Sequence, residues 1–192
     1  MHDPAEMPDR LARFLTEHEP EATDIQVVHY EAMTGGYSRI LAAAHVTWRR
    51  NGATEEHRFV LRGDPPPDRS LIHTDRRTEW EVLRAVAERC NIAGALYFDP
   101  TGDRLGTPAI VLQHAGTTSL LRFCAERDEL DPLPIRVAEA AASIHRIADE
   151  DVPSCIARPA SYDDYLSARI DEWRQTASAH IEAAPILNYK RQ

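Results

Sequence analysis

The chain has 192 residues, 43% of them hydrophobic and 28% charged, which is ordinary for a globular protein of one medium domain or two small lobes. Its 22 Lys and Arg against 31 Asp and Glu give a net charge of −9, which disfavours a surface that binds nucleic acid or anionic membrane without sequence preference. No apolar run approaches the about 18 residues of a spanning helix and the first residues are acidic, so we expect a cytoplasmic protein. Because Cys90, Cys124 and Cys155 are odd in number and widely spaced, we expect buried or incidental thiols rather than disulfides or a zinc site.

The start of the chain predicts a leading helix within residues 1–21, followed by three strands. Leu11, Phe14 and Leu15 share one helical face. Residues 25–30 read as a first strand. In the second strand apolar side chains alternate, as expected when one face is covered: Ile40, Ala42, Ala44, Val46 and Trp48. Asn51-Gly52 is a strong hairpin signal because both residues tolerate positive φ, so the third strand, ending at Arg62, completes an antiparallel meander.

The next segment predicts one helix and two more strands. A proline-rich loop at residues 64–68 breaks the pattern, and residues 75–89 then carry Trp80, Leu83 and Ala87 at helical spacing. Residues 95–98 and 109–112 read as strands around a turn at residues 99–103. Residues 22–113 therefore predict an α+β lobe, a five-stranded antiparallel sheet with one helix.

After a linker at residues 114–118 the chain shows only helical patterns, so residues 119–192 predict a separate helical region. The patterns cover residues 119–127, 133–148 and 161–182. The last helix carries one apolar stripe: Tyr162, Leu166, Ile170, Trp173, Ala177 and Ile181.

Three segments follow one another along the chain: a turn Thr34-Gly-Gly-Tyr-Ser-Arg39, a strand end Phe59-Val-Leu-Arg62 and a helix segment Thr78-Glu-Trp-Glu-Val-Leu83. Their order resembles that of the phosphate loop, the basic strand residue and the helix glutamate of small-molecule kinases. On these motifs the chain resembles, over about residues 10–182, the N-terminal lobe and first C-lobe helices of the aminoglycoside phosphotransferase-like family, which has the protein-kinase fold. The most similar branch is the one related to the kinase-like domain of an acyl-CoA dehydrogenase family. The resemblance implies ATP as the nucleotide and an unidentified small-molecule hydroxyl as the phosphate acceptor.

The turn and the third strand supply the candidate phosphate-binding residues. Gly35, Gly36 and Ser38 suit phosphate because glycine lets backbone N–H groups approach and a hydroxyl adds a donor, although a plain hairpin turn has the same sequence. Val60 and Arg62 share a strand face, and the resemblance implies Val60 at the adenine and Arg62 at the phosphates. Arg62 stands where better-known aminoglycoside kinases carry lysine, and an exposed charge at a strand end is the alternative.

On the predicted helix, the resemblance implies that Glu79 pairs with Arg62. Glu81 is the rival, and a solvated helix face is the alternative for both residues. A histidine at the position of His145 is common in the family, but we interpret His145 as a packed helix residue rather than a catalytic one.

The segment after residue 109 resembles the crossing from strand to linker that holds adenine. There the resemblance implies Leu112 behind the base, with the Gln113 carbonyl and the Ala115 amide at its edge. A buried strand leaving a sheet would have nearly the same sequence.

No His-Gly-Asp-x-x-x-x-Asn segment and no later Asp-x-Glu segment occurs before Gln192, so we assign no catalytic residue and no metal ligand. We therefore expect a truncated or remnant form that is inactive alone and binds ATP weakly, with magnesium needed only in a full-length form. A non-enzymatic nucleotide-binding or interaction module is the alternative. If its apolar stripe is exposed, the last helix should promote self-association.

Overall fold

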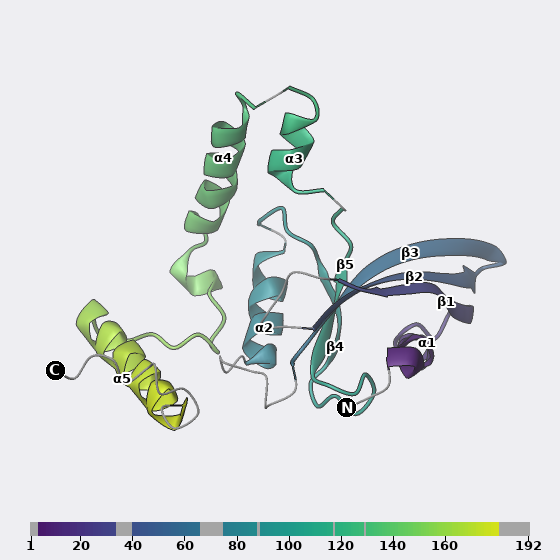
Figure 1. The fold of residues 1–192 in the computed structure, drawn as a ribbon, viewed down its shortest axis with the longest axis horizontal. Helices are drawn as coiled ribbons and strands as arrows, with labels where there is room; N and C mark the ends of the chain where they lie inside the picture. Colours follow the sequence, from purple (N-terminus) through teal and green to yellow (C-terminus); the bar gives the residue numbers. More distant parts are fainter. Residues whose placement is uncertain are drawn as a thin grey trace. The chain divides into compact units, whose positions relative to one another are not determined.

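The computed structural model describes residues 4–33, 40–65, 75–87, 89–116, 118–128 and 130–180 (Figure 1). Within these residues the protein is α+β, with five strands in one antiparallel sheet and five α-helices. The class and the five-stranded antiparallel sheet predicted from the sequence are confirmed. The chain divides into two compact units, Met1–Cys155, which holds the sheet, and Ile156–Gln192, which holds α5 (Tyr162–His180).

The sheet contains the predicted meander and, at its other edge, the two later strands. Its strands are β1 (Thr23–Ala32), β2 (Ile40–Arg50), β3 (Ala53–Gly63), β4 (Ala95–Asp99) and β5 (Ala109–Gln113). They lie in the order β1-β2-β3-β5-β4, and each neighbouring pair is antiparallel. This order places β3 at the centre of the sheet.

The turn between β2 and β3 is the predicted Asn51-Gly52 hairpin. The φ angles are 51° at Asn51 and 80° at Gly52, and a two-residue turn with both angles positive matches the twist of its strands. A Cβ on Gly52 would meet no atom within 4 Å, so backbone conformation alone favours glycine there. The pairing runs without a shift from Arg50 opposite Ala53 to Ile40 opposite Gly63, which fixes the face on which each β3 side chain lies.

The main core lies between the sheet and the leading helix, α1 (Met7–His18) (Figure 1). The predicted face of α1 is buried there: Leu11, Phe14 and Leu15. The predicted alternation in β2 is confirmed at four positions: Ala42, Ala44, Val46 and Trp48. It is wrong at Ile40, which is 43% exposed at the first residue of the strand.

A second, smaller cluster lies on the other face of the sheet, under α2 (Arg76–Val86). Alternate side chains of β5 separate the two clusters, because Val111 belongs to the main core whereas Ile110 belongs to the second. Trp80 of α2 stacks on Phe98 with ring centroids 5.4 Å apart. The helix was predicted over residues 75–89, whereas α2 ends at Val86. Ala87 was predicted to lie on its apolar face and is exposed.

The helices after the sheet are α3 (Leu120–Ala125), α4 (Leu133–His145) and α5, as three helical patterns predicted. Between β5 and α3 the described residues form no helix or strand. The interpretation of His145 as a packed residue is wrong, because it is exposed in the last turn of α4. Cys90 and Cys124 are buried and Cys155 is half-buried, and all three are free thiols. None of the helices in the described segments is both long and apolar enough to cross a membrane.

The loop between β4 and β5 is organised by one buried carboxylate, Asp99. It accepts hydrogen bonds from the backbone N–H groups of Gly102 at 3.0 Å, Arg104 at 3.0 Å and Leu105 at 2.8 Å. The sequence predicted a turn here but not this buried acceptor. Such an arrangement stabilises the loop because hydrogen bonds to a charged group are stronger than neutral ones.

Asp99→Asn is expected to lower the free energy of unfolding by about 1–2 kcal/mol, since an amide nitrogen would face a backbone donor in a buried place. Urea denaturation measures the loss. The matched control is Asp103→Asn in the same loop, where the carboxylate is exposed and accepts from the Thr101 hydroxyl, and its loss should stay below about 0.5 kcal/mol. Equal losses in the two variants would contradict this role of Asp99.

We expect Tyr97 of β4 to make the free energy of unfolding decrease at alkaline pH. Burial, and then its hydrogen bond to the Glu19 carboxylate, raise the pKa of the Tyr97 hydroxyl above its ordinary value. The unfolded chain loses this proton near pH 10 while the folded chain keeps it, so the stability contribution is present below about pH 10 and falls as pH rises above it. Urea denaturation above about pH 10 should show that the free energy of unfolding falls less steeply with pH for Tyr97→Phe than for the parent chain. The remaining decline would include Tyr30, whose pKa burial also raises; identical slopes would contradict the assignment.

Candidate functional site

The strand end of β3 and the helix α2 meet through an ion pair between Arg62 and Glu79. The Arg62 Nε atom lies 3.0 Å from Glu79 Oε1, and the two side chains are 31% and 19% exposed. The predicted pairing is confirmed, with Glu79 rather than Glu81 beside Arg62. Partial burial limits solvent screening of the pair, so each side chain restricts the orientation of the other.

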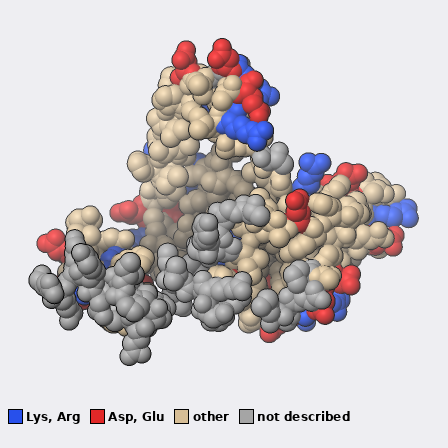
Figure 2. All heavy atoms as spheres, in the orientation of Figure 1, with Lys and Arg blue, Asp and Glu red and all other residues tan. Residues whose placement is uncertain are grey.

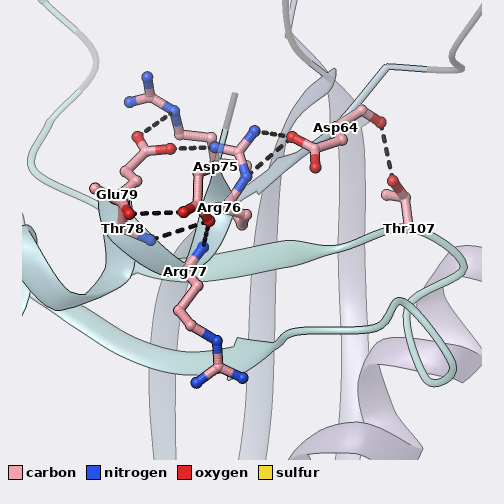
Figure 3. A network of polar contacts seen from close by, with 8 residues as sticks. Asp64, Asp75, Arg76, Arg77, Thr78, Glu79 and Thr107 are labelled. Atoms are coloured by element: carbon pink, nitrogen blue, oxygen red, sulfur yellow. Dashed lines mark hydrogen bonds and ion pairs between the residues drawn. The ribbon is translucent and has the colours of Figure 1, made fainter. Parts of the chain in front are cut away.

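A second arginine, Arg76, contacts the other oxygen of the same carboxylate (Figure 3). Its Nη1 atom pairs with Glu79 Oε2, while its Nε donates to Asp64 Oδ1 at 3.1 Å and its Nη2 contacts the same oxygen. The Arg76 side chain is only 2% exposed. The charges therefore alternate along a continuous set, Arg62, Glu79, Arg76 and Asp64, which we call the ion-pair chain.

The far end of the ion-pair chain is held by backbone contacts. The Asp64 N–H donates to the Pro108 carbonyl at 3.1 Å, and the Thr107 hydroxyl donates to the Asp64 carbonyl at 3.0 Å. Asp64 directly follows β3, and Thr107 and Pro108 directly precede β5. The carboxylate that accepts from Arg76 is thus fixed to the central strands of the sheet.

Arg76 and Asp64 were not among the site residues predicted from the sequence. One signal was available, because Arg76 and Glu79 have the i,i+3 spacing that brings side chains together on a helix. No local pattern relates Asp64 to Arg76, since that contact depends on how the chain returns to the sheet after residues 66–74, which are outside the described segments. A charged residue at a helix start is also ordinarily exposed, so the burial of Arg76 had no sequence signal.

Two predicted adenine-contacting residues lie side by side near the ion pair. Val60 is half-buried on the same face of β3 as Arg62, and it is the cross-strand partner of Leu112, which is buried. Both side chains belong to the small cluster beneath α2. The apolar side chains of Val60 and Leu112 therefore lie two residues along β3 from the charged side chain of Arg62.

The remaining predicted residues fall in two groups. Gly35, Gly36 and Ser38 lie outside the described residues. Gln113 and Ala115 are exposed at the end of β5 and beyond it, and the Gln113 N–H donates to the Gly94 carbonyl at 2.8 Å. Gln113 therefore directly follows Leu112 at the end of β5, and Ala115 lies two residues further along the chain.

Electrostatics around the sheet are mixed, and Figure 2 shows acidic and basic side chains interspersed on the face in view. In the described segments, no group of three or more His, Cys, Asp or Glu side chains is arranged to hold a metal ion.

In comparisons with known proteins, no protein-family model matches this chain and no curated protein matches it.

Proposed function

We propose that the sheet and α2 form the nucleotide-binding lobe of a kinase-like phosphotransferase, in which Arg62 binds phosphate. The observation that carries this proposal is the partly buried ion pair of Arg62 and Glu79, 3.0 Å apart. In the family that the sequence resembles, a basic residue on this strand pairs with a helix glutamate and contacts the phosphates of ATP. The proposed family activity is transfer of the terminal phosphate to a hydroxyl of a small molecule.

The geometry of β3 supports a ligand with an apolar ring and an anionic end. Val60 and Arg62 are two residues apart on one face, a separation of about 7 Å along a strand. Leu112, which is buried, lies across from Val60 and belongs to the apolar cluster against which Val60 packs. We propose that the base lies at Val60 and that the phosphates lie about 7 Å further along the strand, at Arg62.

The charge balance of the site supports weak binding. The formal charges of the four residues in the ion-pair chain cancel, so the site as a whole does not strongly attract an anion. A polyphosphate would bind there mainly through hydrogen bonds that the Arg62 guanidinium donates to its oxygens. Directed bonds to an arginine with a fixed orientation still favour phosphate, because the planar guanidinium matches phosphate oxygens in pairs. We therefore propose weak ATP binding by this lobe.

Calorimetric titration of the chain with ATP, adenosine and inorganic triphosphate tests the proposal. ATP should bind more tightly than adenosine, because adenosine cannot contact Arg62, and more tightly than triphosphate, because triphosphate cannot contact Val60 and Leu112. Repeating the ATP titration with and without Mg²⁺ measures the contribution of the metal ion. Equal affinities for ATP and adenosine, or no binding of either, would contradict a phosphate-binding role for Arg62.

A second candidate function, an interaction module, is favoured by the side chains that α5 exposes. Tyr162 is 72% exposed and Trp173 is 58% exposed, and other members of the predicted stripe are exposed as well: Leu166 and Ile170. Ile181 lies outside the described residues. Exposed apolar residues that follow one another along a helix face mark an association surface, and the occupant we propose is a second copy of the chain.

Sedimentation velocity over a range of concentrations should show self-association of the parent chain. The double variant Ile170→Asp with Trp173→Asp should reduce it, because burying two carboxylates in an apolar contact is costly. Gln175→Glu, on the opposite side of the same helix, is the matched control and should associate like the parent. A parent chain that remains monomeric throughout would refute this second candidate.

A further inference from the structure

The buried position of Arg76 requires an explanation, because a charged side chain withdrawn from water is unfavourable unless ionic partners surround it. Its guanidinium meets two carboxylates, Glu79 in the same helix and Asp64 just after β3. Arg76 therefore connects the first turn of α2, which carries Glu79, to the residue that follows β3, the strand that carries Arg62.

Glu79 uses its two oxygens for two different arginines. Oε2 contacts Arg76 Nη1, and Oε1 lies 3.0 Å from Arg62 Nε. A glutamate side chain has several rotatable torsions, so a contact at one oxygen limits the directions in which the other can point. With Oε2 held by a planar guanidinium, Oε1 is directed at Arg62.

The other side of Arg76 is fixed by an anchored acceptor. Asp64 Oδ1 accepts hydrogen bonds from both the Nε and the Nη2 of Arg76, and the Asp64 backbone is hydrogen-bonded to Thr107 and Pro108. Further along α2, Trp80 and Leu83 attach the helix to the sheet through apolar contacts. Arg76 supplies a polar attachment at the first turn of α2, the turn that also carries Glu79.

We infer that Arg76 is a positioning residue, which orients Glu79 so that its ion pair with Arg62 is already formed before any ligand binds. Asp64 is the anchor for this contact. The consequence for phosphate binding by Arg62 rests on the function proposed above, whereas the effect on the ion pair does not. Loss of Arg76 or of the Asp64 charge should therefore loosen the Arg62 side chain in the ligand-free protein.

Solvent exchange of the Arg62 Nε–H, followed by ¹⁵N NMR on the full chain, tests the inference without ligand. Asp64→Asn and Arg76→Lys should each accelerate this exchange about tenfold, since opening of the ion pair becomes more frequent. A lysine keeps the charge but cannot contact two carboxylates with a planar fork. The matched control is Arg77→Lys, because Arg77 is exposed and its side chain points away from the ion-pair chain in Figure 3.

An unchanged exchange rate of the Arg62 Nε–H in both variants, even with lower thermal stability, would show that Arg76 is only structural and would overturn the inference. Asp64→Asn decides the matter if Arg76→Lys does not fold, because it keeps an acceptor oxygen at nearly the same volume. Faster exchange in the variants, with Arg77→Lys like the parent, is the result that supports it.

ATP titrations of the same variants separate the inference from the proposed function. If the parent chain binds ATP, Arg76→Lys should weaken binding about three- to tenfold, and this loss should disappear when Glu79→Gln is already present, because Arg76 acts through Glu79. If Arg76→Lys weakens ATP binding equally when Glu79→Gln is present, Arg76 does not act on ATP binding through Glu79, and the inference is overturned. If the parent chain binds no ATP, the proposed function fails, and the exchange rates of the Arg62 Nε–H still decide the role of Arg76.

Discussion

Phe14→Ala is expected to lower the free energy of unfolding by about 3–5 kcal/mol, the usual cost of removing a fully buried phenylalanine. Phe14 lies in the main core, where its ring meets Tyr97 edge-on with centroids 6.4 Å apart. Leu11 and Leu15 are buried beside it on the same face of α1. The leading helix is thus part of the core that supports the sheet, so the variant should affect the whole domain.

Chemical denaturation of the parent chain and the variant measures this effect. Thr16→Ala is the control, because Thr16 is exposed on the same helix and its hydroxyl donates only to the Ala12 carbonyl; we expect a change within about 0.5 kcal/mol. A loss below about 1 kcal/mol for Phe14→Ala would mean that α1 contributes little to the core.

Arg62→Met is expected to weaken ATP binding about 10- to 100-fold, because hydrogen bonds to charged groups contribute about 1.5–3 kcal/mol each and methionine keeps much of the side-chain volume. Adenosine binding should change far less, since that ligand has no phosphate. Calorimetry on both ligands gives the comparison. The folded state should persist, because Glu79 keeps its contact with Arg76.

The control for this variant is Arg49→Met, which removes the same charge from an exposed residue near the Asn51-Gly52 turn. Its ATP affinity should stay within about twofold of the parent, as expected for a distant exposed charge screened by salt. Equal weakening by both variants would mean that net charge, rather than the position of Arg62, determines the affinity.

The parts of the fold that could be predicted from the sequence depend on local rules. The two-residue period placed Val46 and Trp48 in the core, and the Asn51-Gly52 dipeptide predicted a turn with two positive φ angles. The same period placed Val60 and Arg62 on one face of β3. The pairing of Arg62 with Glu79 required more, because it joins two elements, and it was predicted only through a family resemblance.

The features that the sequence did not predict depend on contacts between distant segments. Asp64 and Arg76 come together because β3 and α2 meet, and no periodicity carries that information. Asp99 was recognised within a turn, but its burial follows from the loop folding back over it. Ile40 was predicted to be covered from the two-residue period, and His145 was interpreted as packed because it lies on a predicted helix. Both are exposed, because a side chain is buried only where another element packs on it.

NMR of the ¹⁵N-labelled chain titrated with ATP tests whether the face of β3 that carries Val60 and Arg62 binds a nucleotide. We expect saturable shifts of the backbone amides of Val60 and Leu112 and of the Arg62 Nε–H, with none at the Asn51-Gly52 turn. Adenosine should shift the Val60 and Leu112 amides and leave the Arg62 Nε–H unchanged. Saturable ATP shifts that avoid Arg62, or no shifts at millimolar ATP, would contradict nucleotide binding at this face of β3.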